Sequence, residues 1–211
     1  DDVEEYLYNV FCDPEIFTLP PILGWLFKRP LAWAISKSRM GEAREAMVRA
    51  GGVSPQIKTI EAQASALGDA LAERGIDARV YLGMRYWHPF TDEAVEAIVR
   101  DGLQKLVIVP LYPQFSLSTS GSALRVLERM LYNQPGFPPK SSVVPAWYNR
   151  QGYLSSMAAL IVESLRSMAH AEPQQAHILY TAQGLPRKYI DDLGDPYQEQ
   201  TERRARRPLC P

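Results

Sequence analysis

Aromatic rings, hydroxyl groups and arginines gather in four short stretches of this sequence. The stretches are residues 85–90, residues 112–122, the pair Trp147-Tyr148 and residues 183–186, and each follows a short apolar run. Aromatic rings stack on flat apolar ligands, whereas arginine and hydroxyl groups bind carboxylates. These residue types therefore predict a binding site for a flat, hydrophobic ligand that carries acid groups.

The motifs and the composition argue against several other kinds of site. The four stretches contain neither a G-x-G-x-x-G fingerprint nor a Walker loop, which argues against a dinucleotide or a nucleoside triphosphate. Lys and Arg number 23 against 24 Asp and Glu, so we expect no nucleic-acid partner. The two cysteines, Cys12 and Cys210, are too few for a four-cysteine metal site. We therefore expect no iron–sulfur cluster, and no pattern in the sequence predicts a tightly bound cofactor.

The apolar runs before the four stretches predict buried β-strands, because they are short and continuous. The predicted strands are residues 79–84, 106–111, 142–145 and 177–182. Helical patterns cover residues 56–74, 92–101 (capped by Thr91), 122–132 and 152–168. This order predicts an α/β fold with a parallel sheet. In such sheets ligands bind beyond the carboxyl ends of the strands, which is where the four stretches lie.

The most apolar stretch of the chain lies near its N-terminus. Residues 16–27 end at Lys28-Arg29-Pro30, after about a dozen residues, where a spanning helix needs ~20. The pattern over residues 16–35 favours two helices joined by a turn and packed on the protein itself. A surface helix in peripheral contact with a membrane is the alternative, because aromatic rings lie beside two cations.

Both ends of the sequence predict a fragment. Residue 1 is Asp, and residues 1–7 predict a helix that is already under way. Residues 203–211 are rich in arginine, break the preceding pattern and end on proline, with an ordinary basic tail as the alternative. Inside the chain, the proline-rich residues 135–139 are the best candidate for a domain boundary. Hydrophobic residues make up 46% of the whole, so a folded core is feasible and general disorder is excluded.

Seven stretches share the order and spacing of one enzyme family. They are residues 6–16 (YLYNVFCDPEI), 51–55 (GGVSP, with Gln63), 83–90 (GMRYWHPF), 110–116 (PLYPQFS), 118–122 (STSGS), 147–148 (WY) and 194–197 (GDPY). With these stretches the chain resembles ferrochelatase, the enzyme that inserts ferrous iron into protoporphyrin IX to make haem. The resemblance extends to residue 202, and residues 84–90 are most similar to plastid and cyanobacterial members.

The resemblance implies a fold of two Rossmann-like, chelatase-type lobes, each a parallel sheet flanked by helices. Residues 1–138 would form the first lobe without its first strand, residues 139–202 the start of the second lobe, and residues 203–211 an atypical tail. The family's distal metal-site Glu would lie beyond residue 211. The implied function is a lyase of haem biosynthesis that takes protoporphyrin IX and ferrous iron. Its implied location is a plastid, or the cytoplasm or membrane surface of a cyanobacterium.

The resemblance also implies which residues contact the porphyrin. They are Arg39, Ser54, Arg85, Tyr86 and Ser118, while Met47 stands where the family has a tyrosine. Structural interpretations compete with these roles. The two arginines could be ion-pair partners, Tyr86 could belong to the core, and Ser118 could cap the following helix.

One position departs from the family where the chemistry is concentrated. The family's strand-end motif Ser-Ala-His-Gly-x-Pro reads Thr-Ala-Gln-Gly-Leu-Pro here, so Gln183 replaces the metal-site histidine. Glutamine does not titrate near neutral pH, and its amide oxygen is a poor ligand for ferrous iron beside imidazole. We therefore expect either a ferrochelatase that is impaired at Gln183 or a tetrapyrrole-binding paralogue that does not insert metal.

Overall fold

A computed structural model describes residues 2–13, 21–49, 51–52, 55–134, 140–168 and 176–206. The chain divides into two compact units. The first contains Asp1–Gln104 with Val126–Pro138, and the second contains Lys105–Arg125 with Pro139–Pro211. The lobe boundaries predicted at residues 138 and 202 stay predictions, because these units follow contacts within this chain alone.

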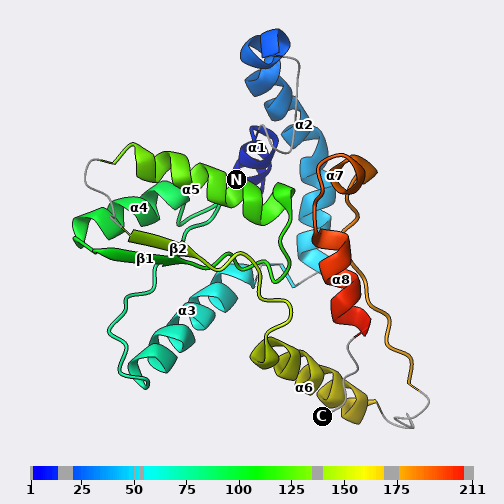
Figure 1. Ribbon diagram of the computed structural model, residues 1–211. Helices are drawn as coiled ribbons and strands as arrows, with labels where there is room; N and C mark the ends of the chain where they lie inside the picture. Colours follow the sequence, from blue (N-terminus) through cyan, green and yellow to red (C-terminus); the bar gives the residue numbers. More distant parts are fainter. Residues whose placement is uncertain are drawn as a thin grey trace. The chain divides into compact units, whose positions relative to one another are not determined.

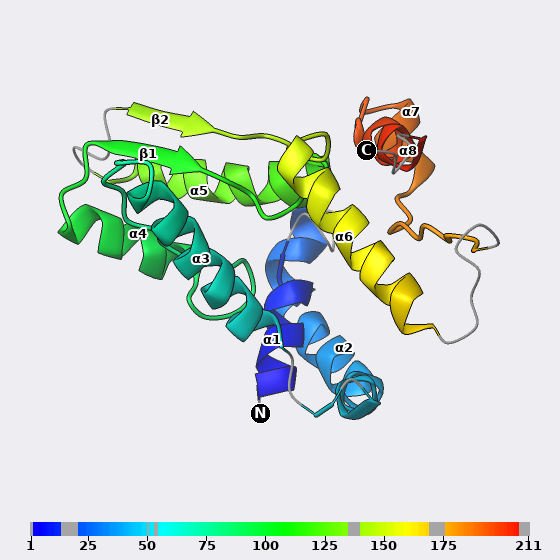
Figure 2. The same cartoon turned by 90° about the horizontal axis from the view of Figure 1, so that it is seen from below.

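Two helices in contact open the first unit. Helix α1 (Asp2–Phe11) packs along α2 (Pro21–Arg49), as Figures 1 and 2 show from two directions. Ala32 and Ser36 are fully buried one turn apart on α2, and Lys37 forms an ion pair of 2.9 Å with Glu4 of α1. The helix expected at the start of the chain is therefore confirmed.

Helix α2 corrects the expected helix–turn–helix over residues 16–35. It is one helix of 29 residues that continues through Pro30, while residues 16–20 lie outside the described part. Proline removes one amide donor from a helix. The rest of the helix keeps its hydrogen bonds, and the packing of α1 against its middle favours a single continuous element. Within the described residues, no helix is long and apolar enough to cross a membrane.

The remaining helices of the first unit follow their sequence patterns closely. Helix α3 is Gln56–Ala72, and α4 is Thr91–Arg100 with Val95 and Ile98 buried. The cap of α4 is Phe90 rather than Thr91, since the Thr91 hydroxyl donates to the Met84 carbonyl at 3.1 Å. The Glu93 carboxylate accepts from the Phe90 amide at 2.7 Å instead, and so satisfies one donor at the helix start.

Two short parallel strands begin the second unit. Strand β1 (Lys105–Ile108) pairs with β2 (Lys140–Val143), with Lys105 opposite Lys140 and Ile108 opposite Val143. Figure 2 shows the two arrows side by side and running the same way. The parallel pairing and the α/β class are confirmed, with strand limits shifted by one to three residues from the predicted ones.

Two of the predicted strands are wrong for the chain as described. Residues 79–83 and 177–182 carry no strand, and Met84 makes only an isolated bridge to Phe90. A strand exists only when a neighbouring backbone accepts its hydrogen bonds, and the described part of the chain offers none beside either segment. Leu179 accordingly remains 87% exposed although its surroundings are apolar in sequence.

The other elements of the second unit are helical. A π-helical turn, η1 (Leu117–Gly121), leads directly into α5 (Ser122–Tyr132), which passes from the second unit into the first. Helix α6 is Gln151–Ser167. The C-terminal part holds α7 (Arg187–Asp191) and α8 (Tyr197–Arg206). Helices predicted over residues 122–132 and 152–168 are thus confirmed.

Polar contacts tie residues 79–83 to the end of α4. The Asp101 carboxylate accepts from the Tyr81 hydroxyl at 2.5 Å and from the Arg79 guanidinium at 2.9 Å. These two contacts, the Tyr81 hydrogen bond first, lower the pKa of Asp101. A side-chain network therefore fixes this segment where no strand ladder holds it.

We expect Tyr81→Phe to raise the pKa of Asp101 toward its ordinary value of 3.8, because the substitution removes a donor to the ionised carboxylate. The lowered pKa stabilises the folded chain above that ordinary value, and the stabilisation is lost as the pH falls through the folded-state pKa. An NMR titration of the Asp101 carboxyl carbon measures the change. Tyr132→Phe, on a 90% exposed tyrosine, is the matched control. An unchanged pKa in Tyr81→Phe would contradict the assigned cause.

Candidate functional site

A buried carboxylate joins two of the predicted ligand-binding residues in the first unit. The Asp13 side chain is 3% exposed and forms an ion pair with the Arg85 guanidinium, whose side chain is 16% exposed. The same oxygen of Asp13 accepts from the Tyr86 hydroxyl at 2.6 Å. The Arg85 guanidinium carbon lies 5.3 Å from the centre of the Tyr86 ring. We call Asp13, Arg85 and Tyr86, with Tyr6 and Asn9, the Asp13 cluster.

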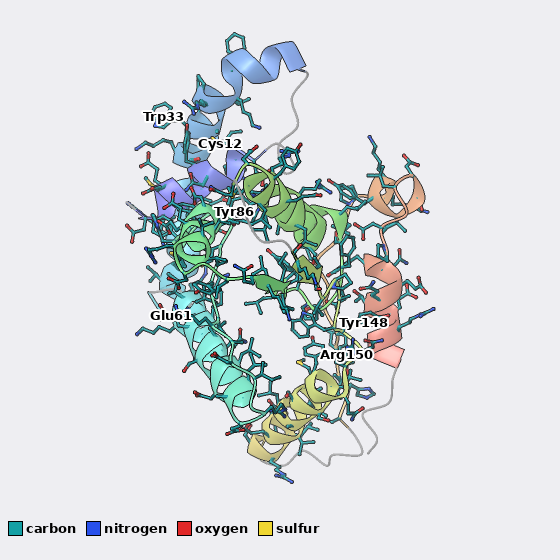
Figure 3. All side chains as sticks on the ribbon, turned by 60° about the vertical axis from the view of Figure 1, so that its left-hand side comes forward. Cys12, Trp33, Glu61, Tyr86, Tyr148 and Arg150 are labelled. Atoms are coloured by element: carbon teal, nitrogen blue, oxygen red, sulfur yellow. The ribbon has the colours of Figure 1, made fainter. Side chains whose placement is uncertain are left out.

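One face of α1 and the turn after it supply the other half of this cluster. Tyr6, Asn9 and Asp13 are spaced by three and four residues, which aligns them along one side of a helix. Asn9 donates to the Tyr86 carbonyl at 3.2 Å, and the Tyr6 ring meets the Tyr86 ring edge-on at 6.5 Å. Figure 3 shows Tyr86 beside the end of α1 near Cys12. Tyr86 is therefore held through its backbone, ring and hydroxyl.

The turn that carries Arg85 and Tyr86 is closed by its own backbone. The Met84 amide donates to the Pro89 carbonyl at 2.7 Å, and the Thr91 amide donates back to the Met84 carbonyl at 3.1 Å. The His88 ring, which is exposed, pairs through Nδ1 with the Glu93 carboxylate of α4 at 2.7 Å. The two ends of the turn thus meet, and its residues project from a fixed base at the start of α4.

A second buried carboxylate organises the stretch after β1 in the second unit. Asp195, 4% exposed, accepts from the Ser116 hydroxyl and the Leu117 amide at 2.8 Å each and from the Tyr197 amide at 2.9 Å. Ser116 in turn meets the Ser118 hydroxyl at 2.9 Å and accepts from the Ser118 amide. We call these residues the Asp195 cluster. It joins η1 to the start of α8.

Glycine suits the end of η1 because the backbone there is crowded. The Gly121 amide donates to the Ser116 carbonyl at 2.9 Å, the five-residue spacing of a π-turn. A Cβ at this position would lie 3.3 Å from that carbonyl oxygen and 3.4 Å from the Phe115 ring. The Ser-rich sequence therefore builds a tight turn whose hydroxyls are packed inward.

The stretches that follow β1 and β2 meet at the carboxyl ends of the strands. The Trp147 indole donates to the Pro110 carbonyl at 2.9 Å, and the amides of Trp147 and Tyr148 both donate to the Pro113 carbonyl at 2.9 Å. Figure 3 labels Tyr148 and Arg150 in this turn. Two of the four stretches singled out in the sequence are thus brought together, as expected for neighbouring parallel strands.

The structure leaves the other predicted site residues in varied surroundings. Arg39 is exposed on α2, and Gln183 is exposed in residues 176–186, a segment without helix or strand. Ser54 lies outside the described residues. Ser118 belongs to η1, where Ser116 is the capping residue. The ion pair of Arg85 and the hydroxyl pairing of Ser118 give both residues structural contacts, which leave their proposed binding roles as predictions.

The sequence analysis assigned no function to two residues of these clusters. Asp13 and Asp195 stood inside recognised motifs, yet nothing local marks their partners, which lie 72 to 79 residues away. The spacing of Tyr6, Asn9 and Asp13 was the available signal. It identifies a polar helix face but not what that face contacts.

Two further kinds of site are relevant among the described residues, a metal centre and a groove for the acidic ligand. No group of three or more His, Cys, Asp or Glu side chains among them could hold a metal ion. A groove of about 560 Å³ between α1 and α2 is lined by Glu4, Glu5, Tyr8, Arg29 and Trp33. Two carboxylates in its wall oppose a ligand that carries acid groups, so we do not assign the predicted ligand to it.

Fold and clusters define an α/β protein with arginine and aromatic side chains fixed on turns. A family model described as ferrochelatase matches residues 1–208. The chain is 51% identical over 203 residues to the ferrochelatase of Synechocystis sp., covering 96% of this chain and 51% of that protein. It is 47% identical to the chloroplastic ferrochelatase-2 of Oryza sativa subsp. indica, with 96% and 38% covered. The chain belongs to the ferrochelatase family and spans about half the length of the curated cyanobacterial relatives it matches.

We expect Asp195→Asn to loosen the Asp195 cluster, because an amide cannot accept all three hydrogen bonds of the carboxylate. Leaving a buried donor unsatisfied costs about 1–3 kcal/mol. Hydrogen exchange at the Leu117 and Tyr197 amides should accelerate at least ~10-fold, the equivalent of about 1.4 kcal/mol.

The control for this substitution is Asp191→Asn. Asp191 pairs with Arg187 on α7 but is half exposed, and such pairs contribute about 0.5 kcal/mol or less. Equal exchange rates in the wild-type and Asp195→Asn chains would show that the carboxylate does not hold the turn.

Proposed function

We propose that this chain binds protoporphyrin IX and acts in the insertion of ferrous iron to form haem. The observation that carries the proposal is the match of the ferrochelatase family model to residues 1–208. The Asp13 cluster supports it, since Arg85 can bind a carboxylate and Tyr86 can contact a flat ring. Arg39, Ser54 and Ser118 are the further porphyrin-binding residues of this proposal.

Iron insertion requires a base for the pyrrole protons and an exchangeable ligand for the metal. Two pyrrole N–H bonds break, two protons leave, and the porphyrin nitrogens bind Fe²⁺ without any change of oxidation state. A neutral imidazole can take protons near pH 6.5 and can also bind ferrous iron. Gln183 can do neither well, because its amide is not basic and its oxygen is a weak ligand. Porphyrin binding and metal insertion are therefore separable in this chain.

Gln183 also favours a second candidate function. A tetrapyrrole-binding paralogue that holds porphyrin or haem without inserting metal would keep Arg85 and Tyr86 and would not need a base at position 183. The two functions differ in one measurable property, the gain in chelation when histidine replaces Gln183. In either case the relatives suggest a plastid or a cyanobacterium as the location.

A membrane surface is a further proposed partner, through the N-terminal part of α2. Phe27, Leu31 and Trp33 are 53%, 37% and 55% exposed, and Arg29 is exposed beside them. Figure 3 shows Trp33 at the outer surface of α2. Exposed aromatic and aliphatic side chains next to a cation suit the interface of a bilayer. This contact would bring the protein to the phase in which an apolar porphyrin dissolves.

We expect Gln183→His to raise the rate of metal insertion at least ~100-fold, the lower range for a restored general base. The test uses a chimera in which this chain replaces the matching 203 residues of the Synechocystis sp. ferrochelatase, with and without the substitution. Chelation of Fe²⁺ or Zn²⁺ is followed from about pH 5.5 to 8.5, which brackets the histidine pKa. The gain should shrink at acidic pH, where imidazole is protonated.

Porphyrin binding, measured by fluorescence, serves as the control and should be equal in the two chimeras. Equal chelation rates across the pH range would mean that position 183 does not carry the chemistry. Failure of both chimeras to bind protoporphyrin would contradict the proposed function itself.

We expect Phe27→Ser with Trp33→Ser to weaken sedimentation of the chain with vesicles of phosphatidylcholine and phosphatidylglycerol, because burial of apolar area drives interfacial binding. Leu160→Ser, on a 57% exposed leucine of α6, is the matched control and should leave sedimentation unchanged. Equal sedimentation of the double variant and the wild type would show that these side chains of α2 do not contact the membrane.

A further inference from the structure

Asp13 lies where helix electrostatics disfavour a carboxylate. It follows α1, and its amide donates to the Val10 carbonyl at 3.2 Å as the helix ends. The C-terminal end of a helix carries partial negative charge, so an anion there is unfavourable. Asp13 is also almost wholly removed from water, which is a second unfavourable circumstance for a charged group. The helix end and the burial therefore both disfavour an ionised aspartate at this position.

The aspartate is favoured instead by its contacts with the turn that carries Arg85 and Tyr86. One oxygen of Asp13 receives both the Arg85 guanidinium and the Tyr86 hydroxyl. Charge-assisted hydrogen bonds of this kind are short and directional, and they restrict the side chains that make them. Arg85 and Tyr86 are adjacent in sequence, and Asp13 draws both side chains to the same point.

We infer that Asp13 is a positioning residue, which acts on porphyrin binding by fixing the orientations of Arg85 and Tyr86. The inference rests on the proposed function, because it assumes that these two residues contact the porphyrin. A side chain that is already oriented loses less freedom when the ligand arrives, so affinity increases without any contact from Asp13 itself. Asn9 and Tyr6 hold the backbone and ring of Tyr86, whereas Asp13 holds its hydroxyl.

The chain provides a closely matched control for this role. Asp101 also accepts from an arginine and a tyrosine, Arg79 and Tyr81, within the same unit. That network is exposed and lies outside the predicted site. Asp101→Asn and Asp13→Asn therefore make the same chemical change to the same kind of network, and only the second disturbs Arg85 and Tyr86.

Two measurements on the 211-residue chain test the role of Asp13. The first is the Kd for protoporphyrin IX from fluorescence titration, which should rise about tenfold in Asp13→Asn and stay unchanged in Asp101→Asn. The second is the rate of nitration by tetranitromethane, mapped to single tyrosines by mass spectrometry. Nitration of Tyr86 should accelerate selectively in Asp13→Asn, and nitration of Tyr81 in Asp101→Asn. General destabilisation would instead raise the nitration of the other partly buried tyrosines as well.

The outcomes separate this inference from the proposed function. A wild-type chain that does not bind protoporphyrin overturns the proposed function, while the nitration rates still decide whether Asp13 holds Tyr86. An Asp13→Asn chain with a wild-type Kd, or with unchanged nitration of Tyr86, overturns the positioning role. If circular dichroism shows that Asp13→Asn does not fold, Asp13→Glu decides. It keeps the charge but moves the carboxylate, so it should bind porphyrin more weakly than the wild type, and an unchanged Kd overturns the inference.

Discussion

A carboxylate that leaves water must be given hydrogen-bond donors, and this requirement organises both units of the chain. In the first unit Asp13 receives an arginine and a tyrosine from a turn 72 and 73 residues further along. In the second unit Asp195 receives a serine hydroxyl and two backbone amides. Removing water from either aspartate without these partners would be prohibitively unfavourable. Each aspartate therefore fixes a turn that receives no hydrogen bonds from the short strand ladder.

Side-chain networks thus hold turns that a larger sheet positions in other α/β proteins. The described ladder contains two strands of four residues, and only Ala32, Val95 and Ile98 among the described hydrophobic residues are buried. The turn at Arg85 and the π-turn at Ser116 are instead held by ion pairs and hydrogen bonds. Directional contacts of this kind define orientation more strictly than apolar packing does, which suits the binding roles proposed for Arg85 and Tyr86.

Arg85 and Gln183 lie in opposite kinds of surroundings. Arg85 is mostly buried, ion-paired and packed over Tyr86, as a preorganised binding residue would be. Gln183 is exposed in a segment without helix or strand and has no group that titrates near neutral pH. Porphyrin binding needs shape and charge, whereas metal insertion needs a base and an exchangeable ligand. Under the proposed function, Gln183 therefore affects metal insertion and leaves porphyrin binding in place.

The sequence by itself determined the elements that depend on neighbouring residues. Periodicity identified α3, α5 and α6, the apolar runs identified β1 and β2, and the arginine and aromatic residues after them marked the turns. The tertiary structure decided what depends on distant partners. It moved the cap of α4 from Thr91 to Phe90, left residues 177–182 without a strand, and paired Asp13 with Arg85. Helix periodicity is a local property of the chain, but a strand needs another strand and a buried charge needs a counter-charge, and no local pattern specifies where along the chain that partner lies.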